Sequence, residues 1–490
     1  MFHSYLPTFV AYFLAVAALC FIAYRYAGNL SDYILGGRSL SAPIAALGVG
    51  ASDMSSWLLM ALPGAAYVYG MNQVWIALGL CLGAYFNWIF VAKRLRIYTE
   101  MCNDSLTIPS FFDERIHDPK SIIRIVTAAV VLLFFTIYAA AGFKGGALVF
   151  GDTFHLTPHV ALVSSALFIV LYTAIGGFLA ISWVDFFQGC LLFVAIIGVP
   201  VAIFLKLHGV QHHQFVASLS SHWLPSGMHT SSAIMITSFL AWGLGYFGQP
   251  HILVRFMAVK DPNTMPTSRR IHISWMFVAL IGAISVGLLG HYALPETLSN
   301  PESVLIALAK HALPDWLAGL LFAIILSAIM SAISAQLLAA ASAVTADFYA
   351  RFKRSPSCNK HLLQVSRLTV LILGVIALYI AADPSVNILK LASYAWAGLG
   401  ASFGPCVLLS LYWRRLSAKG AIVGILSAAI TVIVWKYLGD HVGGIFKLYE
   451  ILPAFIVNFL IAIPCSLAMP DDNEAVVSTF DKMRELIRKN

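Results

Sequence analysis

Residues 48–57 read GVGASDMSSW, and residues 242–250 read WGLGYFGQP. Each stretch places Gly, Ser or Pro in the middle of a long apolar segment, and the first adds an aspartate, Asp53. In lipid, a broken helix exposes backbone groups that cost several kcal/mol each, so an interruption persists only where protein encloses it. The two stretches therefore predict two interrupted membrane helices and, between them, the position of a site.

The composition around these stretches is that of a membrane protein. Of the 490 residues, 60% are hydrophobic and 11% are charged, and the mean hydropathy is +0.84. A soluble domain carries about 25% charged residues. We predict an all-α polytopic membrane protein, because about thirteen apolar segments are long enough to cross a bilayer as helices. These segments are approximately 6–26, 41–69, 74–91, 122–150, 160–175, 186–207, 232–248, 271–294, 316–349, 368–382, 387–413, 421–438 and 452–468.

The positive charges predict the orientation in the membrane. Lys and Arg concentrate on the cytoplasmic side of membrane proteins. If the N-terminus lies outside and the C-terminus inside, most of the 30 lysines and arginines fall in inner loops. The net charge of +8 then reflects topology rather than a nucleic-acid partner. We predict a multi-pass protein of the cytoplasmic membrane, in contact with the lipid bilayer, whose first segment is retained because no Lys or Arg precedes it.

The two interrupted segments occupy matching positions. If segments two to six form one five-helix unit and segments seven to eleven another, each unit begins with its broken helix. An odd number of helices inverts the second unit, and this pairing is typical of the binding site of a secondary transporter. The alternative is that the small residues merely allow close helix packing. The predicted division is 1–40 (first helix and inner loop), 41–207 (first repeat), 208–231 (extracytoplasmic loop), 232–413 (second repeat), 414–469 (two flanking helices) and 470–490 (cytoplasmic tail).

Asp53 makes the first interruption a candidate ion site. An ionisable residue within a membrane helix is costly and by default marks an ion or substrate path. Freed carbonyls at Ala51 and Met54 could bind a small hard cation beside it. Asp53 could instead cap the half-helix that follows. In the ninth segment, Ala328 and Ser331 are three residues apart and share a helical face, so they could present a carbonyl and a hydroxyl to one cation.

Several runs along the chain resemble the sodium:solute symporter family, and within it the members that carry proline. The resemblance covers nearly the whole length and implies a five-plus-five inverted-repeat symporter fold with flanking helices. The matching runs are LGGRSL at 35–40, GASDMS at 50–55, LFFTIY at 133–138, GGFLA at 176–180, WGLGYFGQPHIL at 242–253 and SYAWAG at 393–398.

The resemblance also implies roles for individual residues. It implies sodium at the carbonyls of Ala51, Met54 and Ala328 and the hydroxyl of Ser331, assisted by Ser55, Asp53 and Asp185, with Arg38 near the inner mouth. It implies L-proline at Trp57, Tyr138, Trp242, Tyr246 and Pro250. Physical chemistry supports the second set, because aromatic surface suits the proline ring and half-helix ends suit its charged groups. We assume here that Trp242 and Tyr246, four residues apart, share a face.

One position departs from the family pattern. Members of the family usually carry a second hydroxyl residue directly after the site serine, and this chain has Ala332. Another oxygen, from Ser56 or water, could replace it, or the protein could couple to protons through Asp53 or Asp185. A symporter of another small solute is also open. With no P-loop and no catalytic cluster, we expect neither an ATP-driven pump nor an enzyme, and neither a cofactor nor an obligatory protein partner.

Overall fold

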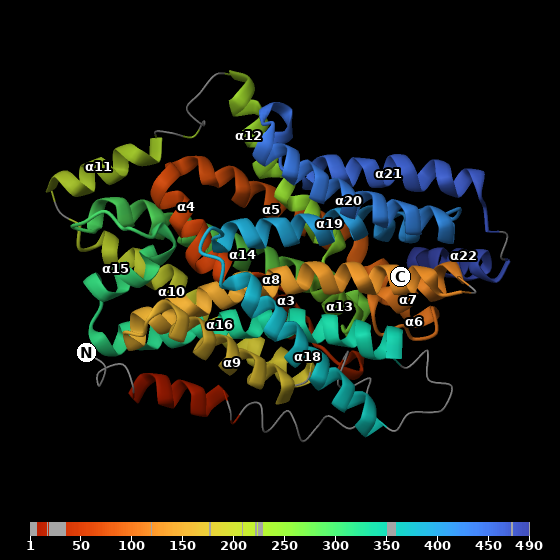
Figure 1. The fold of residues 1–490 in the computed structure, drawn as a ribbon, viewed down its shortest axis with the longest axis horizontal. Coiled ribbons are helices and arrows are strands. Elements are labelled where there is room, and N and C mark those ends of the chain that lie inside the picture. The colour runs from red at the N-terminus through yellow and green to blue at the C-terminus, as the bar shows by residue number, and fades with distance from the viewer. Residues whose placement is uncertain are drawn as a thin grey trace.

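The computed structural model describes residues 7–16, 18, 36–118, 120–175, 178–207, 209–220, 223, 229–349, 359–471 and 474–489. The described residues form helices that run roughly parallel along the long axis of the molecule (Figure 1). Nine of these helices are long and apolar enough to cross a membrane, and the described residues add three shorter apolar helices. The all-α polytopic fold is confirmed, whereas the count of thirteen crossings stays a prediction.

Some of the predicted features lie outside the described residues. They include the end of the first segment and the start of its inner loop (19–35), Gly176 and Gly177 of a family run, much of the predicted extracytoplasmic loop (221–222 and 224–228), and part of another inner loop (350–358).

The first predicted repeat contains an interrupted helix followed by long helices. Its elements are α3 (Ala42–Asp53), η2 (Trp57–Ala61), α4 (Leu62–Tyr69), η3 (Gly70–Gln73), α5 (Val74–Asn87), η4 (Trp88–Ala92), α6 (Lys93–Met101), α7 (Ile108–Ile116), α8 (Ile122–Phe154), α9 (Pro158–Ile175) and α10 (Phe178–Phe204).

The second predicted repeat follows the same plan. Its elements are α12 (His229–Ala241), η5 (Trp242–Gly248), α13 (Pro250–Met257), η6 (Pro262–Thr264), α14 (Met265–Ala293), η7 (Pro301–Ser303), α15 (Val304–Ala312), α16 (Asp315–Ser342), η8 (Ala343–Tyr349), α18 (Asn359–Ala381) and α19 (Ile388–Tyr412). The remaining described elements are the first helix (Pro7–Val16), η1 (Gly36–Arg38), α11 (Gly209–Ser220), α20 (Ala418–His441), η9 (Gly444–Lys447), α21 (Ile451–Ala468) and α22 (Glu474–Lys489).

The packing of the two repeats is symmetric under their exchange. Helix α3 packs on α14 as η5 packs on α5, and α8 packs on α19 as α16 packs on α10. Likewise α3 packs on α10 as η5 packs on α19, while α8 and α16 contact each other. Such pairs arise when a pseudo-twofold axis relates two units. The contacts therefore fit two repeats, although the domain boundaries stay predictions.

Both predicted helix interruptions are present. Helix α3 ends at Asp53, the backbone of Met54 leaves helical geometry (φ −87°, ψ 79°), and a π-helical turn resumes at Trp57. This break packs closely on α8, since a Cβ added to Gly145 would lie 2.5 Å from the Ser56 Cβ. The second segment narrows to the 3₁₀ helix η5, extends at Gln249 and restarts at Pro250, a residue favoured at the first position of a helix.

Four helices outside the predicted apolar segments are additional to the prediction. Helices α7 and α22 lie near α6 at one end of the bundle, and α11 and α15 lie toward the other (Figure 1). Helix α22 packs on α6 and buries Phe480 and Met483. The buried Arg115 guanidinium lies over the rings of Tyr98 and Phe480, at 5.4 and 5.1 Å from their centroids. The predicted tail 470–490 is therefore largely a docked amphipathic helix.

Candidate cation and substrate site

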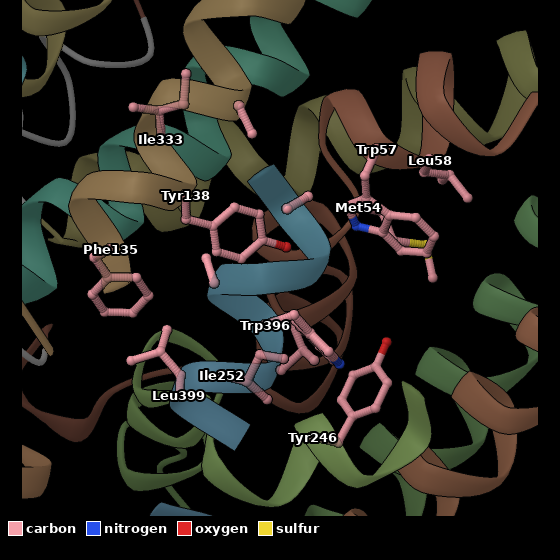
Figure 2. Close-up of a cluster of buried hydrophobic side chains, with 14 of the residues drawn as sticks. Met54, Trp57, Leu58, Phe135, Tyr138, Tyr246, Ile252, Ile333, Trp396 and Leu399 are labelled. Carbon is pink, nitrogen blue, oxygen red and sulfur yellow. The ribbon is translucent and has the colours of Figure 1, made fainter. Parts of the chain in front are cut away.

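The two helix breaks meet at a buried hydrogen bond. The hydroxyl of Tyr246, on η5, donates to Oδ2 of Asp53, at the end of α3. The Trp57 indole N–H donates to the carbonyl oxygen of Asp53 at 2.8 Å. Figure 2 places Trp57, Tyr246 and Tyr138 in one buried cluster. The structure thus brings together Asp53 and three of the predicted proline-binding residues, although they are separated by up to 193 positions in sequence.

The first break leaves oxygen atoms available for a ligand. Among the described residues, Oδ1 of Asp53 is buried and has no hydrogen-bond partner. The N–H of Ser55, which in an unbroken helix would donate to the carbonyl of Ala51, donates instead to that of Asp53 at 3.1 Å. The Ala51 carbonyl therefore loses its helical donor. A carboxylate oxygen and a freed carbonyl are the hard ligands that a small cation prefers.

Side chains from other helices donate hydrogen bonds to the unwound backbone of the second break. Asn87 on α5 donates to the carbonyl of Tyr246 at 2.9 Å, and the Trp396 indole on α19 donates to the carbonyl of Trp242 at 2.8 Å. Gln249 in turn donates to the carbonyl of Trp396 at 3.0 Å. Unwound backbone within a membrane needs such substitutes for its lost helical bonds. Sequence reasoning missed these roles, although Asn87 is an amide within an apolar segment and Trp396 lies in a family run.

Trp242 and Tyr246 do not share a face, contrary to the sequence-based assumption. A 3₁₀ helix has about three residues per turn, so residues four apart are offset by about a third of a turn. The Trp242 ring stacks on Tyr449 at 5.3 Å between centroids and lies 6.2 Å from that of Trp57. The Tyr246 ring instead packs edge-on against Trp396 at 5.1 Å. The two aromatic rings thus form different walls of the site.

A second polar group surrounds the other predicted sodium residues. Ser331 on α16 donates its hydroxyl to Oδ1 of Asp185 on α10, and Oδ2 of Asp185 pairs with the Arg255 guanidinium on α13. Arg255 also donates to the Ser182 hydroxyl at 2.9 Å. Sequence reasoning missed Arg255, which it counted only as an inner-loop charge. The signal available in the sequence was the presence of two opposite charges, Asp185 and Arg255, on membrane segments, where a charge needs a partner.

The remaining predicted sodium residues lie on elements that pack together. Ala51 belongs to α3, Met54 and Ser55 follow it directly, and α3 packs on both α10 and α16. Ala328 lies three residues before Ser331 in the regular part of α16, and its side chain is buried. The predicted sodium residues therefore surround the junction of α3, α10 and α16, and Asp53 reaches from it toward η5.

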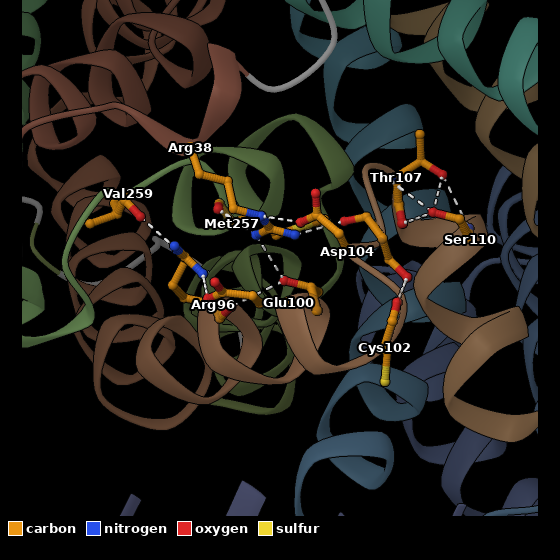
Figure 3. Close-up of polar contacts among 11 residues, drawn as sticks. Arg38, Arg96, Glu100, Cys102, Asp104, Thr107, Ser110, Met257 and Val259 are labelled. Atoms are coloured by element: carbon orange, nitrogen blue, oxygen red, sulfur yellow. Dashed lines mark hydrogen bonds and ion pairs between the residues drawn. The ribbon is translucent and has the colours of Figure 1, made fainter. Parts of the chain in front are cut away.

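Arg38 lies at the centre of a network that holds the C-terminal end of α13 (Figure 3). Its guanidinium donates to Asp104 Oδ1 at 2.7 Å, to the Met257 carbonyl at 2.7 Å and to the Ser105 carbonyl at 3.1 Å. Burial lowers the pKa of Arg38, and the hydrogen bond to Asp104 opposes this shift. A single β-bridge joins Leu40 to Val259 beside this network. Arg38 thus ties the start of the first predicted repeat to α13, the C-terminal half of the second broken helix.

Replacing Arg38 with alanine should loosen this end of α13. The variant loses the donors to two backbone carbonyls, so we expect the solute uptake that the family resemblance implies to fall by at least about tenfold. Asp104→Asn is the matched control, because the Asp104 side chain is 61% exposed and exposed ion pairs contribute about 1 kcal/mol or less. Initial uptake rates in cells with equal surface expression measure both. Equal losses in the two variants would show that only the ion pair matters.

Comparison with known proteins agrees with this geometry. The model of the sodium:solute symporter family matches residues 33–427. Proteins named sodium/proline symporter from Staphylococcus aureus strains JH9 and NCTC 8325 / PS 47 are 41% identical over 492 aligned residues, which cover 98% of this chain and 95% of the relative.

Solved structures share the fold at low sequence identity. A Na⁺-coupled sialic acid symporter in a substrate-bound outward-open state matches with a TM-score of 0.76 at 18% identity, over 94% of this chain and 98% of that chain. A nucleobase-cation-symport-1 family transporter in a closed conformation matches with a TM-score of 0.55 at 15% identity, over 93% of this chain and 99% of that chain. With the family model and the close relatives, these findings place the chain in the sodium:solute symporter family, as a multi-pass membrane transporter.

Proposed function

We propose that this protein imports L-proline together with Na⁺ across the cytoplasmic membrane by alternating access. The observation that carries the proposal is the junction of the two breaks, where Asp53 meets Tyr246 and keeps one buried carboxylate oxygen without a hydrogen-bond partner among the described residues. Relatives at 41% identity are named for sodium and proline, which agrees with this substrate pair.

Sodium is the proposed coupling ion. Its ligands are the carbonyls of Ala51, Met54 and Ala328 and the hydroxyl of Ser331, with Ser55, Asp53 and Asp185 nearby. Ala332 removes one hydroxyl, but the Asp185 carboxylate in contact with Ser331 offers another hard oxygen next to the site serine. The hydroxyl hydrogen of Ser331 points to Asp185, which leaves the oxygen lone pairs of Ser331 for a cation.

Proline is proposed to bind among Trp57, Tyr138, Trp242, Tyr246 and Pro250. Trp57 and Tyr246 each donate a hydrogen bond to Asp53. Trp57 donates to the backbone carbonyl of Asp53, and Tyr246 donates to its carboxylate. Sodium bound near Asp53 would therefore hold in place the two aromatic side chains that proline contacts. Bound proline would in turn hold these side chains, and through them Asp53, in the position that binds sodium. Such mutual stabilisation is the reciprocal coupling that symport requires.

The proposed orientation has the N-terminus outside and the C-terminus inside. The end of the bundle that carries α6, α7 and α22 then faces the cytoplasm and holds basic residues such as Lys93, Arg94 and Arg96. The Arg38 network at this end would close the inner side of the site and would open when proline is released.

A competition panel tests the proposed substrate. Uptake of labelled L-proline into cells that express the protein should be suppressed by unlabelled L-proline and much less by a monocarboxylate, a sugar or pantothenate. The reason is that aromatic walls and a buried carboxylate fit a compact zwitterion better than an anion or a polyol. Stronger suppression by one of the other solutes would mean that this solute, and not proline, is the substrate.

Trp242→Ala should weaken proline binding while it preserves cation dependence. The change removes a wall between Tyr449 and Trp57, so the half-saturating proline concentration should rise by at least about tenfold. Trp316→Ala is the control, because the Trp316 side chain is largely exposed on the outer end of α16. Concentration series of proline uptake at fixed sodium measure both. An unchanged half-saturating concentration in Trp242→Ala would remove this residue from the site.

A further inference from the structure

Three aromatic rings from three separate segments pack in series at the proposed proline site. The Trp242 ring on η5 lies 6.2 Å from that of Trp57 on η2 and 5.3 Å from that of Tyr449, with interplanar angles of 35° and 27°. All three side chains are buried. Tyr449 lies between η9 and α21, in the part of the chain that follows both predicted repeats. A segment outside the predicted repeats therefore supplies one ring of the series.

Hydrogen bonds fix both the backbone and the side chain of Tyr449. Its N–H donates to the hydroxyl of Ser238 on α12 at 2.9 Å, and its own hydroxyl donates to the carbonyl of Ser393 on α19 at 2.7 Å. The carbonyl of the preceding residue, Leu448, accepts the indole N–H of Trp435 on α20 at 2.9 Å. Three helices therefore set the position of the Tyr449 ring, which can serve as a rigid support.

The side chain of Trp242 is restrained in another way. Its backbone is fixed, since the Trp396 indole donates to its carbonyl at 2.8 Å. The chain next to it is also tightly packed, because a Cβ added to Gly83 would lie 2.4 Å from the Cα of Gly243. The Trp242 indole N–H makes no hydrogen bond to another described residue. Because stacked aromatic rings attract each other, the contact with Tyr449 favours one orientation of the indole among the rotamers that the backbone allows.

We propose that Tyr449 is a positioning residue for the amino-acid substrate: it holds the Trp242 indole in the orientation that forms one wall of the site, and this wall limits the size of the solute ring. The inference rests on the proposed function and adds to the site a residue from outside both predicted repeats. Without the Tyr449 ring, the indole can enter about three side-chain rotamers, with about two ring orientations in each. Only molecules with a correctly placed indole bind the substrate well, so the apparent affinity falls by about three- to sixfold.

Tyr449→Ala tests the positioning role in concentration series of proline uptake. The half-saturating proline concentration should rise by about three- to sixfold, while the maximal rate per molecule at the cell surface stays within about twofold. Tyr449→Phe keeps the ring and loses only the bond to Ser393, so its half-saturating concentration should stay within about twofold of the unmodified value. If Tyr449→Ala does not reach the membrane, Tyr449→Leu takes its place, because leucine fills much of the same volume without an aromatic face.

Phe446→Ala is the matched control for Tyr449→Ala. It removes a ring contact in the same segment, that with Trp435 at 4.8 Å between centroids, and leaves the stack of Tyr449 on Trp242 intact. Its half-saturating proline concentration should therefore stay within about twofold of the unmodified value. No rise in Tyr449→Ala, or an equal rise in Phe446→Ala or Tyr449→Phe, would overturn the inference.

A double variant separates the positioning of Trp242 from an independent effect of Tyr449. Tyr449→Ala combined with Trp242→Ala should have a half-saturating proline concentration within about twofold of that of Trp242→Ala alone, because no indole is left to position. If the two single effects multiply instead, Tyr449 does not act through Trp242 and the inference fails.

Size discrimination is a readout that a merely structural role would not change. L-pipecolate has a ring one carbon larger than that of L-proline, and one methylene can change binding in an apolar pocket by about tenfold or more. We compare the half-inhibitory concentrations of pipecolate and proline against labelled proline. Their ratio should fall by at least about twofold in Tyr449→Ala and stay unchanged in Phe446→Ala. An unchanged ratio in Tyr449→Ala would overturn the inference.

The proposed function is tested separately by the unmodified protein. Absence of proline uptake by that protein would refute the proposed function itself. When the unmodified protein does take up proline, the outcomes for the Tyr449 variants decide only the role of this residue.

Discussion

Replacing Arg255 with methionine should lower the free energy of unfolding by about 3–5 kcal/mol in sodium-free buffer, because it leaves the Asp185 carboxylate unpaired in a buried site. Both side chains are almost fully buried, with exposures of 1% and 0%. Denaturant titration of the purified protein in detergent measures the loss. Sodium should restore part of the lost stability in this variant, since a bound cation at Asp185 would replace the missing guanidinium.

Two controls separate the buried pair from general damage. The double variant Asp185→Asn/Arg255→Gln removes both charges and should recover much of the stability, because no unpaired charge remains. Lys310→Gln breaks an exposed ion pair with Asp152 and should cost about 1 kcal/mol or less. If the double variant is as unstable as Arg255→Met, or if sodium has no effect on the single variant, Asp185 is not the group that responds to a cation.

Asp53→Asn should raise the half-saturating sodium concentration by at least about tenfold, which corresponds to about 1.4 kcal/mol of lost cation binding. The substitution removes the negative charge but retains the shape of the side chain and an oxygen that accepts the Tyr246 hydroxyl. Sodium titrations of proline uptake measure this shift directly.

Tyr246→Phe is the matching control for Asp53→Asn. It removes the hydroxyl of the same hydrogen bond but leaves the carboxylate in place, so it should alter proline affinity more than sodium affinity. If Asp53→Asn leaves sodium activation unchanged, Asp53 positions Tyr246 and does not serve the cation.

The parts of the fold that follow from local sequence were predictable. Gly, Ser and Pro within long apolar runs indicated both breaks, and the structure ends α3 at Asp53 and unwinds Trp242–Gly248. Helix α22 was missed because its apolar residues lie on one face, so hydropathy alone does not reveal it. Helix α11 was treated as part of a loop because its twelve residues are rich in His, Gln and Ser.

The contacts that complete the site depend on long-range packing. Arg255 pairs with Asp185 across 70 positions, and Asn87 reaches the Tyr246 carbonyl across 159. No local pattern specifies such pairs, although an unusual polar residue in an apolar segment identifies each participant as a candidate. The different directions of Trp242 and Tyr246 depend on the 3₁₀ geometry of η5, which the sequence alone did not determine.

The most direct test of sodium-coupled proline transport is labelled L-proline uptake into proteoliposomes under separately imposed gradients. An inward sodium gradient at zero membrane potential should drive proline above its equilibrium level, and an inward proton gradient of equal size should not. Accumulation driven by protons alone would contradict the proposed coupling and would identify Ala332 as the mark of a changed coupling ion.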